Sequence, residues 1–243
     1  MNLDILAFAA HPDDVELAMG GTIVNFTKNK LKVGIIDFTQ GELGTRGTKL
    51  TRKNEANDAS KILGITVRDN LKFPDGNVFE NKKNTLKVIS KIRQYKPKLI
   101  FAPYFNDRHP DHIETSKIVK RAMFLAGLPK IKTELKDKLQ NAYRPSKLFY
   151  YMQTYEFQPS FIVDISKSFE TKMNAVRAYK TQFYIEGINS NQPETFISNP
   201  QFIKYLKARA QTFGFAIRKN YGEPFFCEEA IELDLTKLLE ELK

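Results

Sequence analysis

The sequence predicts an α/β fold, with a mostly parallel, Rossmann-like sheet covered by helices on both faces and a smaller C-terminal α+β extension. Two observations lead to this prediction. Apolar β-type runs alternate with helical patterns through the first half of the chain, and neither a repeat nor a low-complexity linker interrupts it. We therefore expect a single domain over residues 1–243, with the core in residues 1–130 and the extension in residues 131–243.

Four apolar runs of the first half are expected to form strands. They are Leu3–Ala10, Val33–Thr39, Asn70–Phe73 and Leu99–Pro103. Helical patterns lie between them at Val15–Lys28, Lys53–Leu63 and Asn84–Tyr95. In the last of these, Leu86, Ile89 and Ile92 recur at a spacing of three residues, which indicates one apolar face. This alternation predicts parallel strands joined by helices.

The second half is less regular. A helix is expected from His112 to Leu125, and the structure of the charged stretch Ile131–Tyr143 is left open. Beyond it we expect strands at Lys147–Thr154 and Phe161–Ile165, helices at Ser166–Phe183 and Pro200–Thr212, a β-run at Phe225–Leu233 and a short C-terminal helix. The stretch Glu186–Pro200 is rich in Asn, Ser, Pro and Gly, which predicts a long loop that could act as a lid.

Composition and charge narrow the class of protein. No apolar stretch approaches the roughly 20 residues that span a bilayer, no secretory signal is visible, and the single cysteine, Cys227, can form no internal disulfide. We therefore expect a cytoplasmic protein with no membrane partner. The net charge of +10 is spread over scattered lysines rather than a basic stripe, so we expect a small-molecule partner and no nucleic acid.

All three histidines lie in or beside two His-Pro-Asp motifs, at residues 11–14 and 109–112. Each motif follows an expected strand. Ligands of open α/β sheets bind beyond the carboxyl ends of the strands, at the point where the strand order reverses. If the strands Leu3–Ala10 and Leu99–Pro103 are neighbours, the two motifs meet across one crevice.

The residue types in these motifs indicate a catalytic metal site. Two imidazoles and a carboxylate, from His11, His112 and Asp14, suit Zn²⁺, and on ligand type alone they also suit Fe²⁺. Three protein ligands leave a position for water, whereas a structural zinc usually has four. Asp13 is then the expected general base, and His109 is expected to stabilise the oxyanion or to protonate the leaving nitrogen. Asp111 either orients an imidazole or is an acid favoured by the helix dipole.

At these residues the chain resembles the PIG-L/LmbE-like family of zinc deacetylases, over nearly its whole length. The shared motifs include Ala10 to Glu16, Gly20-Gly21, Gly41 to Gly44, Arg52 with Glu55, Phe73 to Gly76, Arg108 to His112 and Tyr221 to Phe225. Within the family, Arg108 to His112 and Lys180 to Phe183 are most similar to the bacillithiol-biosynthesis branch.

The resemblance implies hydrolysis of the acetamide of N-acetyl-α-D-glucosaminyl L-malate. It implies the zinc ligands, base and oxyanion group named above, and it adds Arg52 and Asp75 as substrate-binding residues. An arginine fork suits the dianionic malate, although Arg52 could instead be a surface helix residue and Asp75 part of a Pro-Asp-Gly turn. The resemblance also implies a homo-oligomer.

One position departs from the related mycothiol-pathway enzymes. They carry a tyrosine two residues before the equivalent of His109, where this sequence has Asp107, so Tyr184, Tyr205 and Tyr221 are left as candidates for its role. Two alternative functions stay open. One is a deacetylase or amidase of another N-acetylglucosamine or thiol conjugate, and the other is a non-catalytic zinc-binding or polyanion-binding protein.

Overall fold

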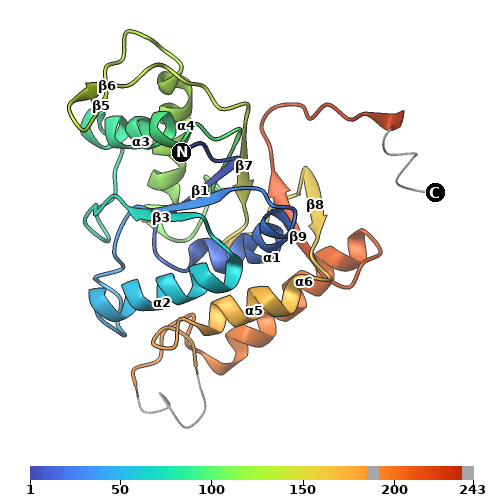
Figure 1. Cartoon of the computed structure of the whole chain (residues 1–243). Coiled ribbons are helices and arrows are strands. Elements are labelled where there is room, and N and C mark those ends of the chain that lie inside the picture. The colour runs from blue at the N-terminus through green and yellow to red at the C-terminus, as the bar shows by residue number, and fades with distance from the viewer. Residues whose placement is uncertain (185–191, 237–243) are drawn as a thin grey trace.

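Seven strands form one sheet in the computed structural model, which describes residues 1–184 and 192–236 (Figure 1). In spatial order the strands are β3 (Val67–Asn70), β2 (Val33–Asp37), β1 (Ile5–Ala9), β4 (Leu99–Pro103), β7 (Lys147–Tyr151), β9 (Gly222–Phe226) and β8 (Phe161–Asp164). The first five are parallel, and β9 is antiparallel to both β7 and β8. The predicted mostly parallel α/β fold is confirmed.

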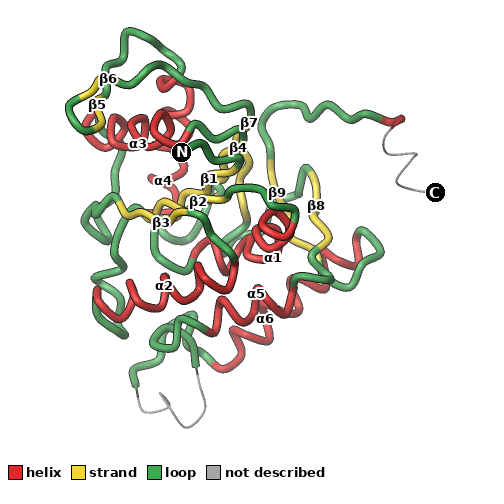
Figure 2. Tube along the Cα trace, in the orientation of Figure 1, coloured by secondary structure: helices red, strands yellow, loops and turns green. Residues whose placement is uncertain are grey.

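Helices cover both faces of this sheet (Figures 1 and 2). One face carries α3 (Lys82–Tyr95) and α4 (Pro110–Ala126), and the other carries α1 (Asp14–Lys28), α2 (Lys49–Leu63), α5 (Phe169–Arg177) and α6 (Pro200–Ala216). Strand β1 is apolar along its length because its side chains pack into the hydrophobic core on both faces of the sheet. Ile5, Ala7 and Ala9 pack toward α1, while Leu6 and Phe8 pack toward α3 and α4.

Strands β1 and β4 are adjacent and parallel, with Ile5 opposite Leu99. The chain enters α1 directly after β1 and α4 soon after β4. The two His-Pro-Asp motifs therefore meet at one edge of the sheet, as their positions after the two strands predicted.

Several predicted boundaries were wrong. The third strand spans Val67–Asn70 and shares only Asn70 with the predicted run Asn70–Phe73, in which Lys72 has a left-handed backbone with φ of 54°. Helix α5 spans Phe169–Arg177, which is shorter than predicted, because turns beyond it direct Thr181 and Gln182 toward α2. The last strand spans Gly222–Phe226 rather than Phe225–Leu233, and at its start Glu223 is buried in an ion pair with Lys172.

The region beyond residue 130 extends the same sheet through β7, β9 and β8. The charged stretch after α4 forms a small hairpin of β5 (Glu134–Leu135) and β6 (Lys138–Leu139). The C-terminal helix and most of the first half of the expected lid fall on residues 237–243 and 185–191, outside the described residues.

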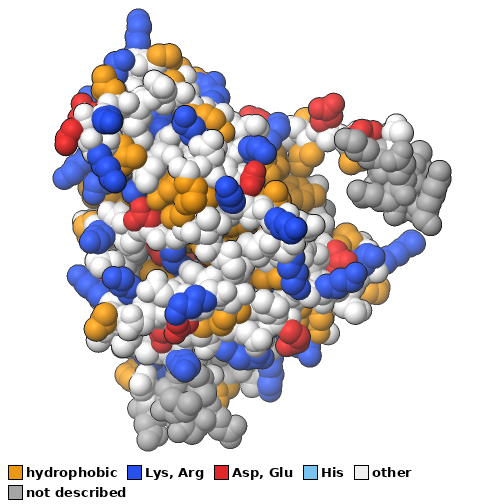
Figure 3. Space-filling view, in the orientation of Figure 1, with side chains coloured by type: hydrophobic (Ala, Val, Ile, Leu, Met, Phe, Trp, Pro, Cys, Tyr) orange, Lys and Arg blue, Asp and Glu red, His pale blue; other side chains and the backbone are white. Residues whose placement is uncertain are grey.

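No helix in the described ranges is long and apolar enough to cross a bilayer. On the face shown in Figure 3, lysine and arginine side chains are spread over the surface among other side chains. The expected cytoplasmic location, small-molecule partner and homo-oligomer stay predictions.

Candidate active site

The first motif forms the turn between β1 and α1. Asp13 is the N-cap of α1 and has φ of 114°, a left-handed conformation that costs energy for a residue with a side chain. The backbone N–H of His11 donates to Asp14 Oδ2 at 2.9 Å, which fixes the turn. The strained turn leaves Asp13 and Asp14 both lining the cavity beyond β1.

The second motif begins helix α4. His109 is its N-cap, and the His109 Nδ1 atom accepts a hydrogen bond from the backbone N–H of Asp111 at 3.2 Å. Pro110 occupies the first helical position, where its missing N–H has no cost. Asp111 and His112 therefore lie in the first turn of α4 and face the motif that follows β1.

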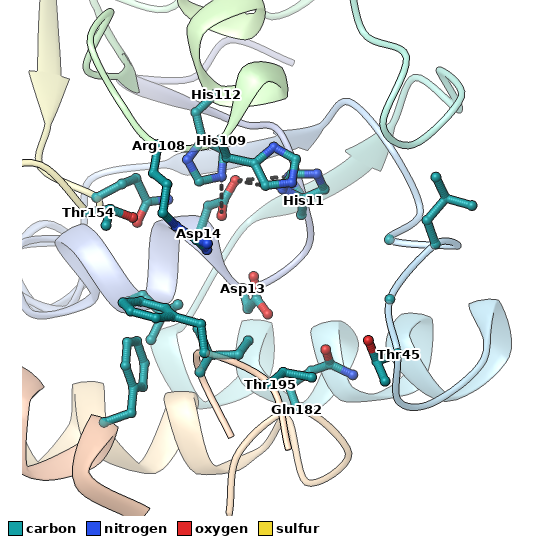
Figure 4. Close-up of a pocket in the computed structure, with 18 of the residues that line it drawn as sticks. His11, Asp13, Asp14, Thr45, Arg108, His109, His112, Thr154, Gln182 and Thr195 are labelled. Carbon is teal, nitrogen blue, oxygen red and sulfur yellow. Dashed lines mark hydrogen bonds and ion pairs between the residues drawn. The ribbon is translucent and has the colours of Figure 1, made fainter. Parts of the chain in front are cut away.

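The three predicted metal ligands lie together (Figure 4). Asp14 Oδ1 is 3.2 Å from His112 Nε2, and Asp14 Oδ2 is 3.7 Å from His11 Nδ1. His109 is also close, because ligand nitrogens of His11, His109 and His112 lie within 4.8 Å of one another. A second such group joins His11 to Asp75 and Asp111. We call the group of His11, Asp14, His109 and His112 the donor cluster. Its imidazoles and carboxylate could bind a metal ion such as zinc.

Three further carboxylates hold the imidazole rings. Asp107 Oδ1 is 2.8 Å from His112 Nδ1, while Asp75 and Asp111 lie 3.1 and 3.3 Å from His11 Nε2. These contacts fix one nitrogen of each ring and leave the other directed at Asp14, as carboxylates behind metal-binding histidines do. Asp111 thus orients an imidazole, and Asp75 contacts the cluster from its turn. The role of Asp107 was missed, although Asp107 lies only five residues before His112, in the turn that precedes α4.

The carboxylates give the cluster a field that favours positive charge. Burial lowers the pKa of His11, but hydrogen bonds to Asp111 and Asp75 outweigh it and raise that pKa to about 10. Burial also lowers the pKa of His112, but the charge of Asp14 and the hydrogen bonds to Asp107 and Asp14 together outweigh it and raise that pKa to about 9. A bound cation would be stabilised by the same field.

Asp13 is held by Arg52 from α2. Burial raises the pKa of Asp13 to about 7 despite the opposing charge of Arg52. The Arg52 Nη2 atom donates to Asp13 Oδ2 at 3.2 Å and also to the carbonyl of Pro12, and Nη1 donates to Gln182 Oε1 at 2.5 Å. The guanidinium is therefore buried against protein groups, although Arg52 also lines the cavity. Gln182 belongs to a motif visible in the sequence, but its contact with Arg52 depends on the fold.

A cavity of about 450 Å³ opens over the cluster. Its floor holds the histidines with Asp13 and Asp14, and Arg108 and Thr154 lie beside them (Figure 4). Helix α6 forms the opposite wall with four residues at helical spacing, Phe202, Tyr205, Leu206 and Arg209. Of the three tyrosine candidates, Tyr205 lines this cavity, and Tyr221 stacks on Phe169 with ring centroids 3.8 Å apart.

Part of the expected lid closes the same cavity. Residues 195–197 line it, and Arg46 donates hydrogen bonds to the carbonyls of Gln192 and Pro193 at 3.0 and 2.7 Å. The described part of this segment is therefore attached to the loop that precedes α2.

Comparisons with known proteins identify the family. The family model of PIG-L, described as GlcNAc-PI de-N-acetylase, matches residues 6–123. The conserved protein TT1542 from Thermus thermophilus, known from a crystal structure, is 36% identical with a TM-score of 0.85, and the match covers 96% of this chain and 97% of that one. The chain belongs to the PIG-L family.

Two of the curated relatives that the chain resembles are named as deacetylases. The diacetylchitobiose deacetylase of Thermococcus kodakarensis is 29% identical over 192 residues, which cover 74% of this chain and 70% of that protein. A probable N-acetyl-α-D-glucosaminyl L-malate deacetylase 2 of Bacillus anthracis is 30% identical over 141 residues, covering 53% of this chain and 62% of that protein. This PIG-L protein is accordingly a hydrolase of the deacetylase type.

Proposed function

We propose that this protein is a zinc-dependent N-deacetylase that hydrolyses the acetamide of an N-acetylglucosamine conjugate. His11, Asp14 and His112 would hold the zinc. The observation that carries the proposal is that Asp13, a buried carboxylate paired with an arginine, lines the same cavity as the donor cluster. A bound zinc ion would polarise the amide carbonyl and lower the pKa of water at the site.

The protein side chains supply the proton transfers. Asp13 accepts the proton of the attacking water, and Arg52 holds its carboxylate in position. His109 Nδ1 accepts the N–H of Asp111, so a neutral His109 carries its proton on Nε2. That N–H is available to the developing oxyanion or to the leaving nitrogen.

The malate conjugate is the favoured substrate, and Arg108 supports it better than Arg52 does. The Arg52 guanidinium is bonded to protein groups, whereas Arg108 is exposed at the cavity with its guanidinium carbon 4.6 Å from the centroid of the Phe196 ring. No carboxylate in the described part of the chain forms an ion pair with Arg108. Its fork is therefore free for a malate carboxylate.

The test is release of free amine by the zinc-loaded protein from N-acetylglucosaminyl malate, N,N'-diacetylchitobiose and N-acetylglucosamine. The malate conjugate should be hydrolysed fastest, and Arg108→Ala should raise its KM by about tenfold while leaving the KM of N-acetylglucosamine unchanged. Faster hydrolysis of chitobiose would select the alternative substrate. Absence of amine from all three, with salt-dependent binding to a polyanion, would overturn the enzyme proposal.

A further inference from the structure

Gln153 lies on the cavity wall, two residues beyond the end of β7. Its side chain is neutral and can both donate and accept hydrogen bonds. Only 8% of the residue is exposed, and in the described part of the chain no group accepts a hydrogen bond from its buried Nε2 atom. A buried amide N–H group without an acceptor is destabilising unless a ligand supplies one.

The backbone around Gln153 is fixed from two sides. Arg209 of α6 donates to the carbonyl oxygen of Gln153, and the backbone N–H of Thr154 donates to Asp107 Oδ2 at 2.8 Å. Asp107 also contacts His112. The backbone of Gln153 is thus held between the donor cluster and the wall formed by α6, so the residue that carries the amide has a set position at the cavity.

The hydrogen-bonding properties of the Gln153 side-chain amide indicate which group of a substrate it would bind. A carboxylate would be bound more strongly by the free fork of Arg108, and the reacting acetamide is expected at the donor cluster with Asp13. A hydroxyl group both donates and accepts, and the amide can turn about its last bond to offer either its oxygen or its nitrogen. A hydroxyl of the sugar ring matches these properties.

We propose that Gln153 is a specificity-determining residue whose side-chain amide binds one hydroxyl group of the substrate's sugar ring. This inference rests on the proposed function, because it requires an N-acetylglucosamine conjugate in the cavity. A substrate that lacks the hydroxyl leaves the buried amide unpaired, so the site discriminates against that substrate.

The test measures kcat/KM for amine release from the parent conjugate and from its 3-deoxy, 4-deoxy and 6-deoxy analogues. The kcat/KM of the wild type should be about tenfold or more lower on one analogue than on the parent conjugate. Gln153→Met keeps the length of the side chain. Its kcat/KM on the parent conjugate should be lower than that of the wild type by a similar factor, and its kcat/KM on that analogue should be no lower still. This non-additivity would not arise from a general structural defect.

Gln140→Met provides the matched control, because Gln140 also has a buried unpartnered amide atom but lies outside the cavity lining. It should respond to all four substrates as the wild type does. Equal sensitivity of the wild type and Gln153→Met to every deoxy analogue would overturn the inference alone. If Gln153→Met fails to fold, a wild type indifferent to all three deletions would overturn it. A wild type inactive on the parent conjugate would overturn the proposed function together with it.

Discussion

Two adjacent aspartates in the first motif have different surroundings. Asp14 lies between His11 and His112, and their positive charge holds the pKa of Asp14 well below its usual range despite burial. Asp13 instead faces Arg52, and its burial raises its pKa. The proposed roles, a metal ligand for Asp14 and a proton acceptor for Asp13, therefore have a physical basis in the contacts of each carboxylate.

Arg52→Leu tests the role of this arginine at the residue scale. Because the guanidinium contacts Asp13 and the Pro12 carbonyl, its loss should lower kcat by about 100-fold on the malate conjugate and on N-acetylglucosamine alike. Steady-state kinetics on both substrates would check this. A selective rise in KM for the malate conjugate would instead support the substrate contact that family resemblance implied.

Residue types and spacing were enough to propose the donor cluster, because both motifs stand directly after apolar runs. They could not reveal the contacts of Gln182 or Gln153. These residues meet the site only through the neighbouring positions of β4 and β7 and the turns after α5. No short-range pattern encodes such contacts.

At the scale of elements, helix α1 depends on a residue from the far end of the chain. The helix is interrupted at Met19, and the carboxylate of Glu223 in β9 accepts hydrogen bonds from the N–H groups of Gly21 and Thr22. Glu223 also pairs with the buried Lys172 at 2.6 Å. It thereby caps the second half of α1 and joins α1, α5 and β9.

Glu223→Ala should therefore lower the free energy of unfolding by about 3–5 kcal/mol, because it leaves the Lys172 ammonium buried without its partner. Urea denaturation would measure the change. Asp58→Ala, which breaks an exposed ion pair with Lys61, is the control and should cost at most about 0.5 kcal/mol. Equal effects of the two substitutions would refute the capping role.

Helix α6 presents one face to the cavity and allows a matched comparison along the helix. Tyr205→Ala removes a ring from the cavity wall and should raise KM by about tenfold with little change in kcat, since we assign the ring to substrate binding rather than to proton transfer. Phe215→Ala removes a ring that is 85% exposed on the same helix and outside the cavity lining, so its kinetics should match the wild type. A fall in kcat without a rise in KM for Tyr205→Ala would contradict this assignment and favour a catalytic tyrosine.

At the scale of the whole molecule, the order of the strands assembles the site. The sequence predicted this arrangement for the first half, where helices and strands alternate regularly. It predicted the second half less well, because β9 and β8 reverse direction and α6 returns to cover the cavity. Those steps depend on long-range packing and on buried pairs such as Glu223 with Lys172 rather than on local periodicity.

The central claim is that the donor cluster and Asp13 together form the active site of a metal-dependent hydrolase. The most direct test is to measure zinc content and amine release on the same preparation of Asp13→Asn, beside the wild type. We predict about one zinc ion per chain in both proteins and a loss of turnover of at least about 100-fold in the variant. An Asp13→Asn protein that retains its zinc and hydrolyses the conjugate at the wild-type rate would contradict the claim.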